Sequence, residues 1–264
     1  MPPGAAPRSA PLSAQSTDPR PVVLFDWGET LMWVPGMIHD PAGHLACVER
    51  IYEPDICAQL GDECRQLPVG LFLEYYHAIC RQQIAESKQT QREHSFDERF
   101  ARALQLAGIR ALPDRRGLRR MSDALGREVA QGARLLDFAA EVVETLARSY
   151  RLGVVSNYPH APVVEATLER FGLRRHFEAI VVSSETGWMK PHADCYRPAL
   201  EALDAPAGRT LMVGDDLRND VKGAKALGLL TAWIAPQATA VDPDVDVHLT
   251  CLSQLPSHCE RLFA

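Results

Sequence analysis

The sequence predicts an α/β protein with a Rossmann-like parallel sheet and an all-helical block inserted into it. The apolar run of residues 22–25 ends directly at Asp26, which is typical of a buried strand with a polar residue at its carboxyl end. From residue 151 onward, strand-like and helix-like segments alternate with short links, as in a sheet covered by helices on both faces. Residues 35–135, by contrast, show helical spacing of apolar residues and no convincing strand.

The carboxyl-terminal half supplies most of the expected sheet. Short apolar runs that end in polar or turn-forming residues predict strands within 151–157, 177–185, 210–216, 229–236 and shortly after 244. Helices are expected at 161–171, 192–203 and 221–228, and at the end of the chain. The helix at 161–171 has the clearest limits, because Pro162 lies in its first turn and Gly172 follows its end.

The inserted block has helical periodicity within 71–87, 96–107 and 121–136. About a hundred residues without a strand cannot belong to the sheet, so we expect a separate domain. The expected division is a leader at 1–20, a core domain at 21–34 and 136–264, and a helical domain at 35–135. The leader is rich in Pro, Ala and Ser and has no apolar signal segment, so we expect it to be disordered.

The bulk composition narrows the class of protein. The chain has 264 residues, 46% of them hydrophobic, and a formal net charge of −6, which argues against nucleic acid or an anionic membrane as the main partner. No run approaches transmembrane length. The seven cysteines form no CxxC pair, so we expect reduced thiols and a cytoplasmic location. The oligomeric state cannot be inferred from these features.

Polar residues gather where the predicted strands end. Asp26, Ser156 with Asn157, and Asp215 each follow an apolar run, and Lys190 lies before Pro191 in a loop. Asp216 and Asp220 add two more carboxylates close to Asp215. So many acidic groups repel one another unless a cation or a lysine lies among them. Because oxygen ligands suit Mg²⁺, the pattern favours a magnesium site.

The four segments VVLFDWGETL, GVVSN, WMKP and VGDDLRNDVKGA resemble the motifs of the haloacid dehalogenase (HAD) superfamily, most of whose members are phosphatases. The resemblance implies a HAD fold whose helical block is a C1-type cap that closes over the active site. It implies that Asp26 is the nucleophile and that Mg²⁺ binds Asp26, the backbone carbonyl of Gly28, and Asp215. It makes Asp216 and Asp220 candidates for the outer shell of the metal. Lys190 would stabilise the developing charge, and the phosphate-binding residues would be Thr30, Ser156, Asn157 and Lys190.

The first motif departs from the family pattern. The superfamily motif reads Asp-x-Asp-Gly-Thr, whereas this chain has Gly28 in place of the second aspartate, which acts as the general acid and base. Glu29 is the only neighbouring carboxylate and a possible substitute, although it also fits an ordinary surface turn. Activation of water could instead come from the cap or from the substrate.

Three alternatives follow from this departure. The segment Asp26-Trp27-Gly28 is similar to phosphonoacetaldehyde hydrolase, which cleaves a C–P bond through a Schiff base on a cap lysine; here Lys88 is the only lysine in the helical block. A dehalogenase is disfavoured, because that family has an arginine soon after the motif and residues 31–49 contain none. A catalytically impaired HAD-fold binding protein is the third. We expect a Mg²⁺-dependent hydrolase that forms an aspartyl phosphate from a small phosphorylated metabolite.

Overall fold

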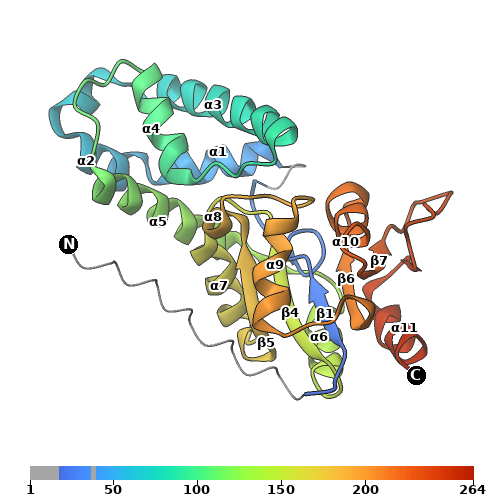
Figure 1. The fold of residues 1–264 in the computed structure, drawn as a ribbon. Helices are drawn as coiled ribbons and strands as arrows, with labels where there is room; N and C mark the ends of the chain where they lie inside the picture. Colours follow the sequence, from blue (N-terminus) through green and yellow to red (C-terminus); the bar gives the residue numbers. More distant parts are fainter. Residues whose placement is uncertain (1–17, 37–39) are drawn as a thin grey trace, which may run out of the picture.

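A computed structural model describes residues 18–36 and 40–264, and the predicted leader therefore lies almost entirely outside the described residues. Six parallel strands form the central sheet in the order β5-β4-β1-β6-β7-β8 (Figure 1). Their bounds are Val22–Phe25 (β1), Arg151–Ser156 (β4), Phe177–Val182 (β5), Thr210–Gly214 (β6), Leu230–Ile234 (β7) and Val247–Leu249 (β8). The predicted parallel sheet is confirmed.

Strand β1 lies at the point where the chain changes direction across the sheet. It pairs with β4 on one side, through Phe25 and Val154, and with β6 on the other, through Phe25 and Val213. The chain builds β4 and β5 outward on one side and then crosses β1 to build β6, β7 and β8. Such a switch point leaves a crevice at the carboxyl ends of the strands, where α/β proteins bind their ligands.

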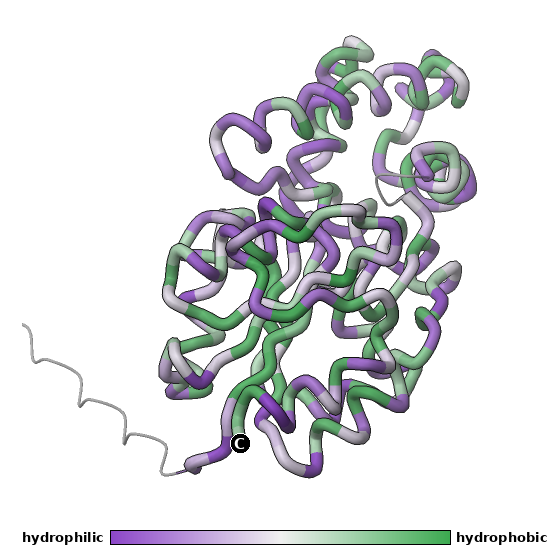
Figure 2. The backbone as a smooth tube through the Cα atoms, turned by 90° about the vertical axis from the view of Figure 1, so that its right-hand side faces the viewer, coloured by the Kyte–Doolittle hydropathy of each residue, from purple (hydrophilic) through white to green (hydrophobic). Residues whose placement is uncertain are grey.

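Side chains of β1 alternate between two hydrophobic cores. Val22 and Leu24 join the core that also contains Cys195 and Tyr196, whereas Val23 and Phe25 join the core that contains Val142 and Val164. This alternation follows from the two-residue period of a strand. Both faces are therefore covered, and the strands appear as mostly hydrophobic tube in the centre of Figure 2.

Helices of the core cover the two faces of the sheet. Helix α9 packs against β4 and β5, and helix α6 packs near the carboxyl-terminal helix α11. The helices outside the insertion are α6 (Ala139–Leu146), α7 (Ala161–Arg170), α8 (Ser183–Thr186), α9 (Ala193–Ala202), α10 (Gly223–Lys225) and α11 (Leu255–Leu262). The same part of the chain also has 3₁₀ and π-helical segments, which are η3 (Arg174–His176), η4 (Ala207–Arg209), η5 (Leu217–Lys222) and η6 (Leu252–Gln254).

The helical insertion, residues 41–132, leaves and rejoins the core through two adjacent short strands. Strand β2 (Met32–Trp33) pairs antiparallel with β3 (Arg134–Leu135), so the two connections lie side by side. The insertion contains α1 (Pro41–Arg50), η1 (Tyr52–Cys57), α2 (Ala58–Leu60), η2 (Gly61–Gln66), α3 (Val69–Thr90), α4 (Phe96–Leu106) and α5 (Arg115–Gly132). Its helices lie beyond the carboxyl ends of the strands (Figure 1). The predicted block, 35–135, is helical over 41–132, but its last two residues form β3. Its status as a separate domain stays a prediction.

The loop between α3 and α4 joins the insertion to the core. The backbone N–H of Met189 donates to Gln91 O at 2.8 Å, and the N–H of Phe96 donates to Pro159 O at 3.4 Å. The Arg92 guanidinium lies over the Trp188 ring, 3.6 Å from its centroid. These contacts place the turn of the helical insertion against the loops that follow β4 and β5.

One expectation about the cysteines is wrong. Cys57 and Cys64 are joined by a disulfide within the helical insertion, seven residues apart in sequence. The scattered spacing gave no sign of this, because the pairing depends on the turn that η1 and η2 make between them. The other five cysteines (47, 80, 195, 251 and 259) are free thiols. Within the described residues, no helix combines the length and apolar character needed to cross a membrane.

Candidate active site

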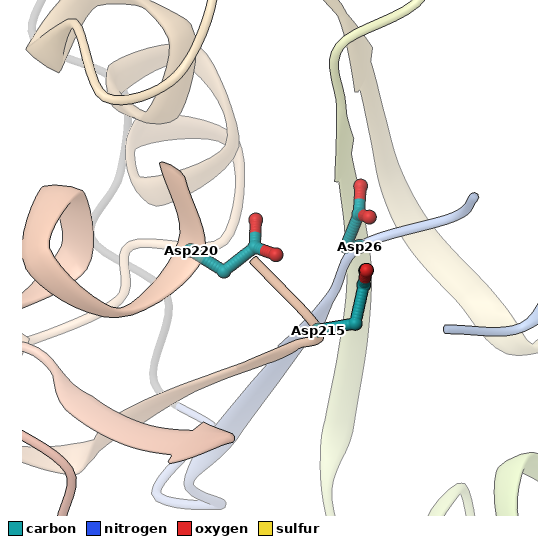
Figure 3. A group of neighbouring side chains, drawn as sticks. All are labelled: Asp26, Asp215 and Asp220. Atoms are coloured by element: carbon teal, nitrogen blue, oxygen red, sulfur yellow. The ribbon is translucent and has the colours of Figure 1, made fainter. Parts of the chain in front are cut away.

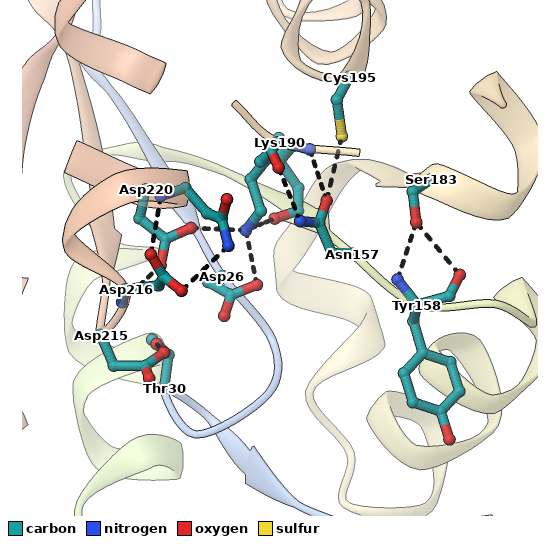
Figure 4. A network of polar contacts seen from close by, with 12 residues as sticks. Asp26, Thr30, Asn157, Tyr158, Ser183, Lys190, Cys195, Asp215, Asp216 and Asp220 are labelled. Carbon is teal, nitrogen blue, oxygen red and sulfur yellow. Dashed lines mark hydrogen bonds and ion pairs between the residues drawn. The ribbon is translucent and has the colours of Figure 1, made fainter. Parts of the chain in front are cut away.

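The ends of β1, β4 and β6 bring together the residues that the sequence singled out. Asp26 directly follows β1, and its backbone N–H donates to Val213 O of β6 at 2.8 Å. Ser156 is the last residue of β4, and Asp215 directly follows β6. Because these three strands are neighbours, side chains separated by up to 189 positions share one end of the sheet (Figure 4).

Lys190 lies at the centre of this group. Its Nζ is 2.7 Å from Asp26 Oδ1 and 2.7 Å from Asp220 Oδ1, and it donates to Val155 O at 2.6 Å. The Lys190 side chain is only 1% exposed, so both ion pairs are shielded from water. Burial alone disfavours its charge, but the two carboxylates outweigh that effect and raise the pKa of Lys190. The two carboxylates therefore favour the charged form of Lys190 and hold its ammonium against Asp26.

Three carboxylates converge beside this lysine. Oxygens of Asp26, Asp215 and Asp220 lie within 4.8 Å of one another, and the side chains point into a common space (Figure 3). Burial raises the pKa of all three, to about 7 for Asp215 and Asp220, and the carboxylates repel one another. One ammonium does not balance three carboxylates, so the group fits a small hard cation such as Mg²⁺.

The hydrogen bonds and ion pairs of these carboxylates indicate which of them could bind a metal ion directly. Lys190 uses Oδ1 of Asp26, and the Thr30 hydroxyl donates to Oδ1 of Asp215 at 3.3 Å, so each keeps a second oxygen that these contacts do not use. Asp220 instead has Oδ1 on Lys190 and Oδ2 accepting from the backbone N–H of Asp216 at 3.0 Å. A cation would accordingly bind Asp26 and Asp215 directly, with Asp220 behind them.

Asp216 lies outside this cluster. Its Oδ1 accepts from the backbone N–H groups of Arg218 and Asn219, both at 2.8 Å, and its Oδ2 accepts from the Asn219 side chain. These bonds satisfy the first turn of η5, which is the role of a residue that caps a helix. Asp216 therefore organises the loop that carries Asp215 and Asp220.

The expected phosphate-binding residues have different surroundings. Asn157 binds the backbone of Lys190 through both polar atoms of its own side-chain amide. Its Oδ1 accepts from Lys190 N at 2.6 Å, and its Nδ2 donates to Lys190 O at 3.1 Å. It is thus a positioning residue for Lys190. Thr30 is 2% exposed and its hydroxyl donates to Asp215, whereas Ser156 is buried at the end of β4. Contact of Thr30, Ser156 and Asn157 with phosphate stays a prediction.

The turn after Asp26 is tightly folded. The Trp27 carbonyl accepts from the N–H groups of Leu31 and Met32, and Glu29 has a left-handed φ of 55°. Trp27 is fully buried, and its indole N–H donates to Thr167 Oγ1 at 3.1 Å. Glu29 is only partly exposed, and its Oε1 is buried without a hydrogen-bond partner among the described residues. Glu29 is a turn residue, but its carboxyl group is not simply solvated.

Two further features bear on the alternatives. Lys88 is exposed in the last turn of α3, so it lacks the desolvated surroundings that a Schiff-base lysine needs. Glu93 was not singled out by the sequence: it lies in the loop between α3 and α4 and accepts from Ser183 Oγ at 2.5 Å. Ser183 also accepts from the backbone N–H of Tyr158, two residues after Ser156. The only sequence signal for this contact was a carboxylate between two predicted helices.

Comparison with known proteins gives consistent results. Residues 21–228 match the model for haloacid dehalogenase-like hydrolases. The chain is 31% identical over 220 residues to the ribulose-1,5-bisphosphate 5-phosphatase of Halopiger xanaduensis, covering 81% of this chain and 84% of that protein. Among solved structures, the 2-haloacid dehalogenase of Pseudomonas syringae pv. Tomato has a TM-score of 0.65 at 23% identity, with 93% and 100% of the chains covered. The magnesium-bound HAD-hydrolase YfnB of Bacillus subtilis has a TM-score of 0.58 at 23% identity, with 91% and 98% covered. At these identities the two structures show a shared fold.

Proposed function

Because this chain belongs to the haloacid dehalogenase-like hydrolases, we propose that it is a Mg²⁺-dependent phosphatase acting on a small phosphate monoester. Its similarity to a ribulose-1,5-bisphosphate 5-phosphatase over most of both chains supports the reaction class. The proposed intermediate is an aspartyl phosphate on Asp26.

The reaction has two displacement steps. A carboxylate oxygen of Asp26 attacks phosphorus, so that an Asp26–phosphorus bond forms while the bond to the ester oxygen breaks, and the departing alcohol takes up a proton. Water then attacks phosphorus, the Asp26–phosphorus bond breaks, and inorganic phosphate leaves. Bound Mg²⁺ would offset the repulsion between the carboxylate and the phosphate.

The observation that carries the proposal is the position of Lys190. Its ammonium lies 2.7 Å from Asp26 and is held there by Asp220, by the Val155 carbonyl and by the Asn157 amide on its backbone. A fixed cation beside a nucleophilic carboxylate keeps that carboxylate ionised and stabilises the charge that develops on phosphorus. A protein that only bound a ligand would not require this arrangement around Asp26.

The family's usual proton donor to the leaving oxygen is missing from this site. Gly28 has no side chain to supply it, and the partly buried Glu29 is the nearest carboxyl group in sequence. We propose that Glu29 assists substrates whose leaving oxygen is strongly basic. Substrates with acidic leaving groups, such as aryl or acyl phosphates, need little assistance.

The substitution Asp26→Asn tests the proposal. Asparagine has nearly the same shape but cannot form an acyl phosphate, so we expect phosphate release from a panel of phosphate monoesters to fall to background. Asp194→Asn is the matched control, because Asp194 is exposed and pairs with Arg197 away from the cluster. Activity of Asp26→Asn within about tenfold of wild type would contradict the mechanism.

The same panel tests the alternative functions. A wild-type enzyme that is inactive on every substrate of the panel would favour the catalytically impaired binding protein. Phosphonoacetaldehyde is included in the panel, with borohydride trapping at Lys88, to test the C–P alternative.

A further inference from the structure

A buried group of polar side chains lies in the helical insertion and takes no part in the site described above. It comprises His44 of α1, Tyr76 and Gln83 of α3, and Arg99 of α4, and none of these residues is more than 8% exposed. We refer to these four residues as the Arg99 cluster. Arg99 occupies the apolar face of α4, where the other buried residues are Phe96, Phe100, Ala103 and Leu104.

Arg99 has only neutral direct partners. Its Nε donates to Gln83 Oε1 at 2.9 Å, and it also interacts with the Tyr76 hydroxyl. No carboxylate in the described part of the chain forms an ion pair with it. Glu93 attracts Arg99 electrostatically without a direct contact, and its two oxygens accept from Ser183 Oγ and from the backbone N–H of His94. A buried charge without a direct ion-pair partner is costly, so the presence of Arg99 here calls for an explanation.

Gln83 and His44 do not compensate this charge. Because arginine can only donate, Gln83 must present Oε1 to Arg99, and its Nε2 then has no hydrogen-bond partner among the described residues. Burial, with the charge of Arg99, lowers the pKa of His44 to about 3, so its ring is neutral. Its Nε2 is 3.2 Å from the Tyr76 hydroxyl. The cluster therefore contains one buried donor without an acceptor, Gln83 Nε2, beside a buried guanidinium that has no direct ion-pair partner among the described residues.

The Arg99 cluster lies next to the loop that follows β4. The Arg99 guanidinium is 5.4 Å from the centroid of the Phe96 ring, and that ring is 6.0 Å from the Tyr158 ring. Tyr158 in turn contacts the Trp27 ring at 5.0 Å, and Trp27 follows Asp26. Side chains of a helix lean toward its amino terminus, and the amino end of α4 bonds to Pro159. Arg99 therefore lies in the first turn of α4, at the end of that helix that contacts the core.

We propose that Arg99 and Gln83 bind a second anionic group of the substrate, so that the preferred substrates are phosphate monoesters that also carry another phosphate or a carboxylate. This inference rests on the proposed phosphatase function. The guanidinium supplies charge and paired donors suited to a phosphate or carboxylate, and the free amide of Gln83 supplies one more. The same groups explain why an arginine occupies an apolar helix face.

Two pairs of substrates test the inference and distinguish a second phosphate from a carboxylate. A pentose bisphosphate is compared with the corresponding monophosphate, and phosphoserine with phosphoethanolamine, which lacks only the carboxylate. We expect wild-type kcat/KM to favour the doubly anionic member of at least one pair by roughly ten- to a hundredfold. Arg99→Met should bring that ratio close to one. Arg102→Met is the matched control, because Arg102 lies one turn along α4 and pairs with Glu86 at the surface.

Thermal unfolding separates a binding role from a structural one. Removing a buried charge that has no direct ion-pair partner should raise the melting temperature of the ligand-free Arg99→Met protein, whereas removing a structural guanidinium should lower it. Should Arg99→Met fail to fold, Arg99→Lys keeps the charge but loses the paired donors, and it should lower the preference several-fold.

Calorimetric binding to Asp26→Asn makes the test independent of turnover. We expect this variant to bind the preferred doubly anionic ligand at least tenfold more tightly than the singly anionic ligand of the same pair. Equal binding within both pairs, or a preference that survives in Arg99→Met, would overturn the inference. Neither result would affect the role of Asp26, which is tested by phosphate release alone.

Discussion

The core and the helical insertion each bury charge, but they do so in opposite ways. At the ends of β1 and β6, three carboxylates converge and one ammonium pairs with two of them, so the site has an excess of negative charge. In the insertion, Arg99 lies among neutral partners, so that site has an excess of positive charge. A buried excess of either sign is unfavourable unless a ligand completes it. This difference is the basis for the two proposals, a cation at the core site and an anionic group of the substrate at the insertion.

The comparison has a direct consequence for stability. Lys190 is a cation between two anions, and its loss leaves those anions unpaired. Arg99 forms no ion pair with the described residues, and the carboxylate of Glu93, which acts on it only without direct contact, keeps its own hydrogen bonds when Arg99 is lost. Equivalent substitutions of the two residues should therefore change the melting temperature in opposite directions.

The largest expected effect is that of Lys190→Met. It removes the donor proposed to stabilise charge on phosphorus, so we expect kcat/KM to fall by about 10²–10³-fold. The melting temperature should fall as well, because breaking a buried pair costs roughly 3–5 kcal/mol. Kinetic assays and thermal unfolding measure the two effects. Lys222→Met is the control, since Lys222 is half-exposed and pairs with Asp242 away from the site. A variant as stable and as active as the control would refute the role given to Lys190.

The next effect concerns the missing acid. A general acid contributes roughly 10²–10⁴-fold to rate, so wild-type enzyme should be slower on alkyl phosphates than on aryl phosphates. If Glu29 assists, Glu29→Gln should slow alkyl substrates at least about tenfold more than aryl ones. Gly28→Asp should restore part of the rate on alkyl substrates. Equal losses on both substrate types would leave Glu29 as an ordinary turn residue.

The smallest expected effect is a pH-dependent stabilisation by Mg²⁺. Burial raises the pKa of Asp215 from 3.8 to about 7, so the folded protein without metal binds protons more tightly than the unfolded chain. That contribution to stability is complete below pH 4 and is lost as the pH rises to about 7. Mg²⁺ binds the ionised carboxylates, so it should raise the melting temperature more at pH 8 than at pH 6.

The size of the shift follows from mass action. Mg²⁺ at a hundred times its Kd stabilises by about 2.7 kcal/mol, which corresponds to roughly 5–10 °C for a chain of this size. Asp215→Asn should abolish most of the shift, whereas Asp246→Asn, in an exposed pair with Lys225, should not. A shift that is larger at pH 6, or that persists in Asp215→Asn, would argue against this metal site.

Much of the core site could be predicted because it depends on local sequence. An apolar run followed by Asp26 or Asp215 predicts a carboxylate at a strand end, and parallel strands place such ends at one edge. The different environments of Asp216 and Asp220 could not be predicted. They depend on η5, which turns Asp216 back onto its own first turn and directs Asp220 toward Lys190.

The insertion was predictable only in outline. Its helical periodicity was visible, but Arg99 meets Gln83 across two helices, and Glu93 meets Ser183 across 90 residues. No local pattern encodes such pairs. One signal was present: Arg99 shares a helical face with Phe96, Phe100 and Leu104, where an arginine is out of place unless it has a function.

Chemical trapping of the intermediate tests the central claim most directly. Borohydride reduces an acyl phosphate to an alcohol, so enzyme quenched during turnover of a phosphate monoester should contain homoserine in place of Asp26. Tandem mass spectrometry of the peptide containing residues 22–31 would locate the change. We expect homoserine at position 26 only when substrate and Mg²⁺ are both present. Steady turnover with an unmodified Asp26, or with homoserine at another aspartate, would contradict the assignment of Asp26 as the nucleophile.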